Sequence, residues 1–395
     1  MLARIVVLLI AIGCLLSCRQ NPDAGGGPGA RAAQTYPYTL DVDADLGLGF
    51  ELRDAAFAKT LDTTAGIEVL ASGFAWSEGP VWVDTMDMLL FSDVPGNVVY
   101  SHTRYSAATP RKPIDPSRPG VQGVDTFLYP SGYLADPTAA GEPGANGLLL
   151  DPDDRLLLAQ HGERRLARWA GDFVEGPRGR YAHADAAYEP LATHYRGRRL
   201  NSPNDLVRLS GGDVLFTDPP YGVDKTFGAD ARELDFSGVY RLPAAALRGD
   251  AAAPAEPELL LRTMTRPNGI AVTPDESAVI VSNSDPQRAQ WRICPLGQPR
   301  ADTSEVELDC TVLADVTALV GEANPGLPDG MAMLPGGVLL ATGPGGVLAL
   351  SPDGEHLGTI RTGRATANVT LGGGDGRDVY ITADDLLLRA RLRGR

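Results

Sequence analysis

Basic residues are scarce in this chain of 395 residues. Lys and Arg number 35 against 50 Asp and Glu, which leaves a formal net charge of −15 at pH 7. A nucleic-acid-binding surface needs clustered cations to replace the counterions of the phosphate backbone, so this balance argues against that class of function. An acidic chain is compatible with binding a metal cation, although acidity also keeps proteins soluble.

The chain offers no apolar run of the length that crosses a bilayer comfortably. The run Ile5–Leu16 follows Arg4 and has about 12 residues, which is typical of a signal peptide. It ends in Leu-Leu-Ser-Cys at Cys18, which resembles the lipobox of bacterial lipoproteins, where cleavage before the cysteine leaves it lipidated. A plain secretory signal cut nearby is the alternative.

We therefore expect three parts: a lipoprotein-type signal at residues 1–18, a Gly/Pro/Ala-rich flexible tether at 19–40 and a domain at 41–395. The protein would be exported to the periplasm of a bacterium or anchored in its outer membrane through Cys18. Arg19, rather than Asp, follows this cysteine, so no inner-membrane retention is indicated.

Cysteine and histidine are rare as well. Of four cysteines, Cys14 and Cys18 belong to the N-terminal segment, which leaves Cys294 and Cys310 as one pair in an oxidising compartment. We expect a disulfide between them, with two buried free thiols as the alternative. Neither this pair nor the five histidines has the spacing of a zinc site, and no G-x-S-x-G motif indicates a serine nucleophile.

Glycine and proline, in contrast, are abundant, with 46 and 31 residues, which indicates many turns between short strands. From residue 67 onward the chain repeats one pattern: an acidic or amide residue beside a small or turn-forming residue, a turn, and a second apolar strand. Six copies begin at Glu78, Asn146, Asn204, Asn268, Asp329 and Asn368, at intervals of 68, 58, 64, 61 and 39 residues.

A second set of positions follows these starts after 14 or 15 residues: Asp93, His161, Asp218, Asn283, Gly343 and Ala383. That spacing brings an antiparallel strand back beside its origin, so each repeat places two side chains at the same end of a hairpin. Such sheets arranged radially make an all-β propeller. A β-sandwich seldom exceeds 200–250 residues, and β-helix repeats are much shorter.

In a propeller the six starts would converge on the central axis as a ring of two carboxylates and four amides. Buried carboxylates are costly unless they are paired or bind a metal, and the ring has no basic member. Oxygen ligands with two negative charges suit a hard divalent cation, calcium before magnesium. Asn-Gly and Asp-Gly are also simple turn formers, but matched positions in six repeats favour the ring. His161 would face the cation, in a structural or a catalytic role.

The motifs WSEGPVW, NSPNDLV with VLFTDPPYG, RPNGIAVTPDES and LPDGMAM resemble the gluconolactonase–regucalcin (senescence marker protein) family over roughly residues 67–385. The resemblance implies a six-bladed β-propeller with a central divalent cation and lactone-hydrolysing activity. It implies metal ligands at Glu78, Asn204, Asn268 and Asp329, with Asp329 also as acid/base. Asn204 and Asn146 are expected to contact the substrate. His161 is similar to the histidine that paraoxonase-type lactonases use as a base.

Two departures from the family pattern stand out. Ser202 occupies a position where regucalcin has an arginine, so that arginine's contact with a sugar acid is not expected here. The last repeat leaves only about 28 residues from Asn368 to the end of the sequence. We therefore expect an N-terminal segment near residues 49–58 to supply the outermost strand of the last blade.

The resulting hypothesis is a lactonase that opens sugar or related lactones. Its cofactor would be Ca²⁺, or another divalent cation such as Zn²⁺, Mg²⁺ or Mn²⁺. The cation would polarise the carbonyl, and His161 or Asp329 would take the proton of the attacking water. A phosphotriesterase-like hydrolase and a non-enzymatic binding propeller of the cell envelope remain as alternatives. The expected partner is a small lactone, with membrane contact only through the lipid anchor.

Overall fold

The computed structural model describes residues 35–103, 114–173, 186–248, 253–297 and 307–394. The predicted signal segment with its lipidation site Cys18, and residues 19–34 of the predicted tether, lie outside the described residues. Regular structure starts with β1 at Tyr38, which is earlier than the predicted domain boundary at residue 41. None of the helices in the described ranges is long and apolar enough to span a bilayer.

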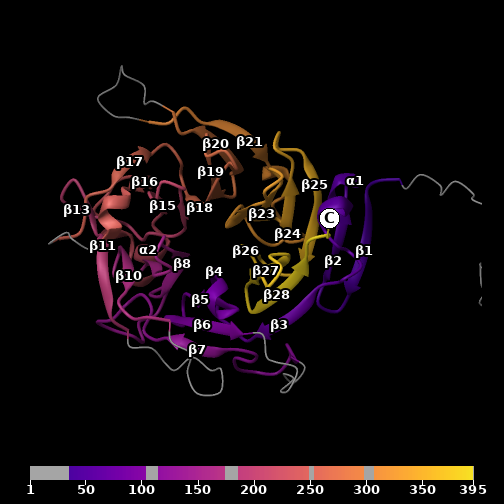
Figure 1. Ribbon diagram of the computed structural model, residues 1–395, viewed down its shortest axis with the longest axis horizontal. Helices are drawn as coiled ribbons and strands as arrows, with labels where there is room; N and C mark the ends of the chain where they lie inside the picture. Colours follow the sequence, from indigo (N-terminus) through magenta and orange to yellow (C-terminus); the bar gives the residue numbers. More distant parts are fainter. Residues whose placement is uncertain (1–34, 104–113, 174–185, 249–252, 298–306, 395) are drawn as a thin grey trace, which may run out of the picture. The chain divides into compact units, whose positions relative to one another are not determined.

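Six antiparallel sheets surround a central axis in the described part of the chain, which confirms the predicted six-bladed β-propeller (Figure 1). Blades 1 to 3, each from its inner to its outer strand, are β4(Ser77–Val83), β5(Met88–Asp93), β6(Val98–Thr103), β7(Asp125–Leu128); β8(Ala145–Leu150), β9(Leu156–Gln160), β10(Arg165–Trp169), β11(Tyr188–Ala192); and β14(Leu206–Arg208), β15(Val214–Asp218), β16(Gly238–Leu242), β17(Glu258–Leu261).

Blades 4 to 6 follow the same order. Their strands are β18(Pro267–Val272), β19(Ala278–Asp285), β20(Arg288–Pro295), β21(Thr311–Asp315); β22(Met331–Met333), β23(Leu339–Gly343), β24(Gly346–Leu350), β25(His356–Thr362), β2(Leu48–Leu52), β1(Tyr38–Asp43); and β26(Asn368–Gly372), β27(Asp378–Ala383), β28(Leu386–Arg391), β3(Glu68–Ser72). The remaining elements are short: α1(Ala55–Thr60), α2(Tyr221–Phe227), η1(Asp84–Met86), η3(Ala229–Ala231), η4(Ala244–Arg248), η5(Thr317–Leu319) and the ribbon β12(His194–Tyr195)–β13(Arg198–Arg199).

The core lies between neighbouring blades, so the middle strands of a blade are covered on both faces. All six residues of β5 are buried, which explains why its sequence MLLFSD does not alternate between apolar and polar. Trp291 of β20 is fully buried and packs in one cluster with Ile280 of its own blade and Leu339 and Leu348 of blade 5. Packing of this kind fixes the blades radially and holds their inner strands at the axis.

Blade 6 combines the last three strands of the domain with one strand from its N-terminal part. β3 pairs with β28, so that Ser72 lies opposite Leu386 and completes the blade with an N-terminal strand. Closure by an N-terminal segment is therefore found, but the predicted segment, residues 49–58, is wrong. β2 instead pairs with β25 of blade 5, because Phe50, Leu52 and Phe57 of this region bury their side chains in the core of that blade.

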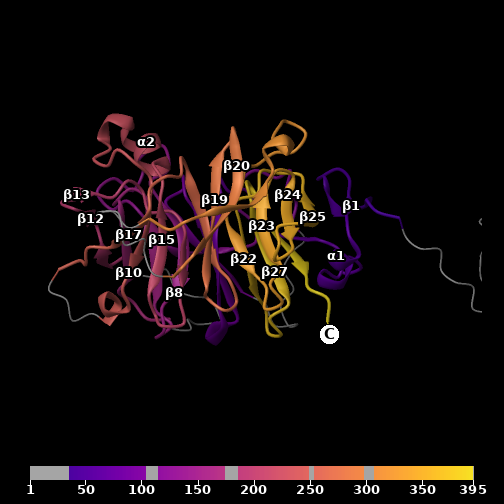
Figure 2. The ribbon, with the colours of Figure 1, turned by 90° about the horizontal axis from the view of Figure 1, so that it is seen from above.

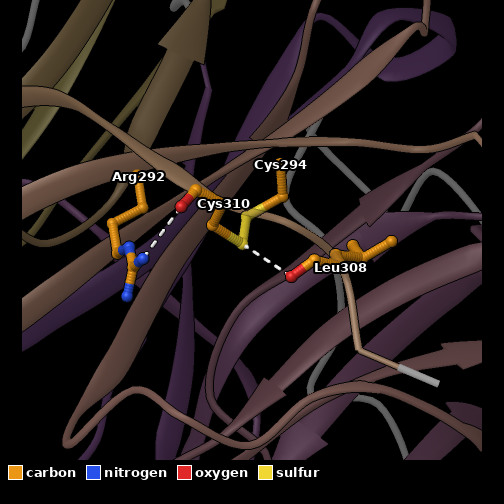
Figure 3. Close-up of a disulfide and its surroundings, with 4 residues drawn as sticks. All are labelled: Arg292, Cys294, Leu308 and Cys310. Carbon is orange, nitrogen blue, oxygen red and sulfur yellow. Dashed lines mark hydrogen bonds between the residues drawn. A yellow bond between two sulfur atoms is a disulfide. The ribbon is translucent and has the colours of Figure 1, made fainter. Parts of the chain in front are cut away.

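A disulfide joins Cys294, on β20, to Cys310, next to β21, the pair that the cysteine count singles out (Figure 3). Both residues belong to the outer part of blade 4. The guanidinium of Arg292 donates a hydrogen bond of 3.0 Å to the carbonyl oxygen of Cys310. The backbone N–H of Leu308 donates to the Leu260 carbonyl of blade 3 at 3.0 Å. The segment that leads into β21 is thus tied to two neighbouring strands.

Candidate functional site

The innermost strands of the six blades contact one another in sequence order around the axis, β4 with β8, β8 with β14, and so on until β26 meets β4 again. Each repeat start lies in its innermost strand or within two residues of its beginning. Five of the six starts line one cavity of about 650 Å³: Glu78, Asn146, Asn204, Asn268 and Asp329. The sixth, Asn368, is buried and its amide donates to Oε2 of Glu78 at 3.5 Å. All six predicted ring positions therefore come together.

The glycine after several ring residues has a packing role in addition to its turn preference. A Cβ on Gly269 would collide with the backbone carbonyl of Asp329 in the next blade, and one on Gly330 would collide with the amide of Asn368. Only a residue without a side chain lets neighbouring inner strands approach so closely. The ring is narrow enough for side chains of successive blades to touch.

A directed chain of hydrogen bonds runs through the amides. Asn146 Nδ2 donates to Asn204 Oδ1 at 2.9 Å, Asn204 Nδ2 donates to Asn268 Oδ1, and Asn268 Nδ2 donates to Ser284 Oγ at 2.9 Å. Ser284 Oγ donates onward to the carbonyl of Pro328, which precedes Asp329. Each amide is held by the next, so the floor of the cavity is a connected polar layer rather than a set of independent side chains.

His161 contacts this polar layer from outside the cavity. Its Nε2 lies 3.2 Å from Asn204 Oδ1, so the tautomer with the proton on Nε2 donates to this oxygen. Gly222 of α2 packs directly on the imidazole. Burial lowers the pKa of His161 and keeps it neutral. His161 does not line the cavity, so its contact with the site runs through Asn204.

Helix α2 lies at one end of the propeller (Figure 2). Its residue Gly222 packs against His161. Ser202, the residue at the position of the family's arginine, holds this helix. Its buried hydroxyl donates to the Pro219 carbonyl at 2.7 Å and accepts from the N–H of Gly222 at 3.0 Å. The serine therefore anchors the helix, which supports the expectation that the arginine contact of regucalcin is absent here.

The site contains three carboxyl groups whose charge, when they are ionised, no basic side chain of the described residues offsets. Burial raises the pKa of Glu78 to about 8, with repulsion from Asp205 as the next cause. Burial, and then repulsion from Glu78 and Asp205, also raises the pKa of Asp329 well above its usual value. No Lys or Arg within the described ranges forms an ion pair with any of these three carboxylates. Such charge indicates a place for a bound cation.

The donor set fits a hard cation. Glu78 and Asp329 carry carboxylate oxygens, and Asn268 Oδ1 accepts one hydrogen bond, which leaves a lone pair for a cation. Asn204 Oδ1 is within hydrogen-bond distance of two donors and would have to exchange one of them for the cation. Asn146 Oδ1 is buried and has no hydrogen-bond partner among the described residues. No group of three or more His, Cys, Asp or Glu side chains in that part of the chain could hold a metal by itself, so amide oxygens would have to complete the coordination.

Asp205 was not expected in the site from the sequence. It occupies the place that glycine takes after four of the other ring residues, and it is 8% exposed. Backbone N–H groups of Leu206 and Ile270 donate to it at 2.9 and 3.2 Å, while burial raises its pKa to about 7. The break in the repeat at this position was the signal that could have indicated a third axial carboxylate.

The second set of repeat positions shapes the loops that lead into the ring. Asp93 accepts from the N–H groups of Ala75 and Trp76 at 3.1 and 3.2 Å, and Asp218 accepts from Asn201 N at 2.8 Å. Asn283 accepts from Arg266 N at 2.9 Å in the same way. Each of these side chains accepts hydrogen bonds from the backbone just before the inner strand of its own blade. In this way it helps to position the ring residue of that blade.

The raised carboxylate pKa values predict how stability depends on pH. Without a cation, the raised pKa values let the folded protein hold protons on Glu78 and Asp329 that the unfolded chain releases near pH 4.5 and pH 3.8, respectively. The unfolding free energy should therefore fall as pH rises from about 5 to 8, by at most about 1.4 kcal/mol per pH unit for each such carboxylate. Urea unfolding with EDTA at several pH values measures this slope, and saturating CaCl₂ should reduce it. A flat or rising curve in EDTA would contradict the prediction.

Comparison with known proteins places this site in a family. Residues 76–385 match the family described as SMP-30/Gluconolactonase/LRE-like region. A gluconolactonase of Zymomonas mobilis is 34% identical over 339 residues, which cover 84% of this chain and 83% of the relative. Among solved structures, a gluconolactonase of Xanthomonas campestris has a TM-score of 0.65 at 26% identity, covering 91% of this chain and 99% of its own.

A regucalcin of Agrobacterium tumefaciens, described as a calcium-binding protein, has a TM-score of 0.52 at 16% identity, covering 82% of this chain and 93% of its own. At that identity the likeness shows the shared fold alone. The family match, by contrast, includes all six ring positions of the propeller. The chain belongs to the SMP-30/gluconolactonase/LRE-like family.

Proposed function

We propose that this protein is a lactonase that depends on a divalent cation and opens sugar or related lactones. The observation that carries the proposal is a pair of carboxylates, the buried Glu78 and the partly exposed Asp329, at the floor of a cavity of about 650 Å³. The 34% identity to a gluconolactonase supports the same reaction. Hydrolysis of a lactone needs stabilisation of a developing oxyanion and a base for water, and this floor supplies groups for both.

Four residues would hold the cation: Glu78, Asn204, Asn268 and Asp329. We propose calcium, because the donors are all oxygens on separate blades and calcium tolerates irregular coordination. The regucalcin neighbour, described as calcium-binding, points the same way. When bound, the cation supplies Lewis-acid stabilisation of the charge that develops on the lactone carbonyl oxygen. Zn²⁺, Mg²⁺ and Mn²⁺ are the ions against which calcium should be compared.

Asp329 is the residue we assign to proton transfer. Asp329 is partly exposed and lines the cavity, so its carboxylate can reach a water molecule beside the substrate. Water adds its oxygen to the acyl carbon, the ring C–O bond breaks, and the leaving oxygen takes a proton to give a hydroxy acid. Asn146 and Asn204 line the cavity and can orient the substrate by hydrogen bonds. His161 would hold Asn204 in place through its Nε2–H.

Replacing Glu78 by Gln keeps the shape of the side chain and removes one of the two negative charges proposed to bind the cation. Calcium binding, measured by calorimetry, and lactone hydrolysis, measured by acid release, should be lost together. Glu68→Gln is a matched control, because Glu68 is an exposed residue of β3 that pairs with Arg389. Hydrolysis at the wild-type rate in Glu78→Gln would show that the cation site is elsewhere.

Replacing His161 by Ala should separate turnover from cation binding. The imidazole contacts Asn204 but neither carboxylate, so kcat should fall about 10- to 100-fold while calcium affinity changes less than tenfold. Steady-state kinetics and calorimetry on the same preparation give both numbers. An equal loss of calcium affinity would mean that His161 acts by supporting the cation site itself.

For localisation, we propose export and lipid anchoring at Cys18. The disulfide between Cys294 and Cys310 supports an oxidising compartment. Wild-type protein expressed in a bacterium should fractionate with the membrane, and Cys18→Ala should lose this association because the lipid attachment site is gone. Membrane association that persists in Cys18→Ala would contradict lipidation.

A further inference from the structure

The cavity is larger than the reaction requires. Cavities of about 300–1,000 Å³ hold drug-sized ligands, so about 650 Å³ exceeds what the ring of a monosaccharide lactone fills. The ring residues occupy only the floor. The residues that line the cavity above the ring therefore determine which substituents of a substrate the cavity can accept.

The walls are divided into two arcs of opposite character. The arc from blades 2 to 4 is polar and includes the ion pair between Glu142 and Lys225, together with Tyr221 and Arg266. The arc from blades 5, 6 and 1 is largely apolar: Val320, Leu327, Ala365, Ala75, Trp76 and Pro95 line it, with Asn324 and Thr366 as its polar members above the ring. A ligand that fills this cavity meets hydrogen-bonding groups on one side and hydrocarbon on the other.

The apolar arc is held in a fixed shape. Val320 and Leu327 pack against the hydrophobic cluster around Trp291, and this contact with the core holds them in place. The loop that carries them is tied by Asn324, whose amide donates to the Leu319 carbonyl at 3.0 Å. Trp76 is oriented by a 3.4 Å contact from its indole N–H to Glu78 Oε1, which places the ring beside a proposed cation ligand.

We propose that the natural substrate is a lactone whose ring carries an apolar alkyl or acyl substituent, which lies against Trp76, Val320 and Leu327. The inference rests on the proposed lactonase function and specifies its substrate class. Hydroxyl groups placed against this arc would lose their hydrogen bonds to water without replacement, whereas a hydrocarbon chain gains by leaving water. A fully hydroxylated lactone such as glucono-δ-lactone matches only the polar arc.

The test compares two lactones with the same six-membered ring, δ-valerolactone and δ-decalactone, which differ by a pentyl group beside the ring oxygen. The wild-type protein with saturating CaCl₂ should have a kcat/KM at least tenfold higher for δ-decalactone. Val320→Thr and Leu327→Asn, which make the arc polar with little change in volume, should reduce this ratio toward one and leave δ-valerolactone hydrolysis nearly unchanged. Val312→Thr is the matched control, because Val312 is 49% exposed on β21 and does not line the cavity.

Three results would overturn the inference. Equal kcat/KM for the two lactones, or a ratio that neither cavity variant changes, would show that the arc does not contact the substituent. A higher kcat/KM for glucono-δ-lactone than for δ-decalactone would assign the cavity to hydroxylated substrates, with the lactonase function intact. Failure to hydrolyse any of the three lactones with calcium bound would instead remove the proposed function, and the inference with it.

Discussion

The burial of carboxylates on the propeller axis is the constraint on which the rest of the site depends. Glu78, Asp205 and Asp329 come from three different blades; burial raises the pKa of all three, and Asp205 adds repulsion to the other two. A domain of this size could fill its axis with apolar side chains at lower cost. A bound cation would offset this cost, because the carboxylates that destabilise the empty ring would then be ligands of the cation.

The amide residues of the ring contribute in a different way. Asn146, Asn204 and Asn268 pass hydrogen bonds from one blade to the next without adding charge. This arrangement couples the blades at the axis, so a displaced amide affects its neighbours in the ring. His161 joins the chain at Asn204, which gives a buried residue outside the cavity a defined route to the chemistry.

Local spacing was sufficient to predict the fold and the ring. The hairpin registers place Ser77 opposite Asp93 and Pro267 opposite Asn283, as a return after about 15 residues requires. This works because a strand, a turn and an antiparallel strand have nearly fixed geometry. The identity of the closing strand, in contrast, depends on which of two N-terminal segments pairs with which of two blade edges. Residues 68–72 take blade 6 and residues 48–52 take blade 5, through packing that no local pattern encodes.

Parts of the site depend on the same kind of distant packing. The repeat placed His161 at the correct end of its hairpin, but it could not show that α2 covers the imidazole or that Ser202 anchors this helix. In the sequence, Asp205 occupies a repeat position where most other copies have glycine. Its location near the axis follows from its contacts with Gly147 and Ile270, which only the structure shows.

The pairing of β3 with β28 has a consequence for biogenesis. The strand that completes blade 6 is among the first of the domain to be synthesised, and its partner, β28, is the last strand of the propeller in chain order. A nascent chain cannot close the circle until β28 has been synthesised. An unpaired edge then remains open on each side of the gap, and this is where a nascent chain would be most exposed to aggregation and to the action of chaperones.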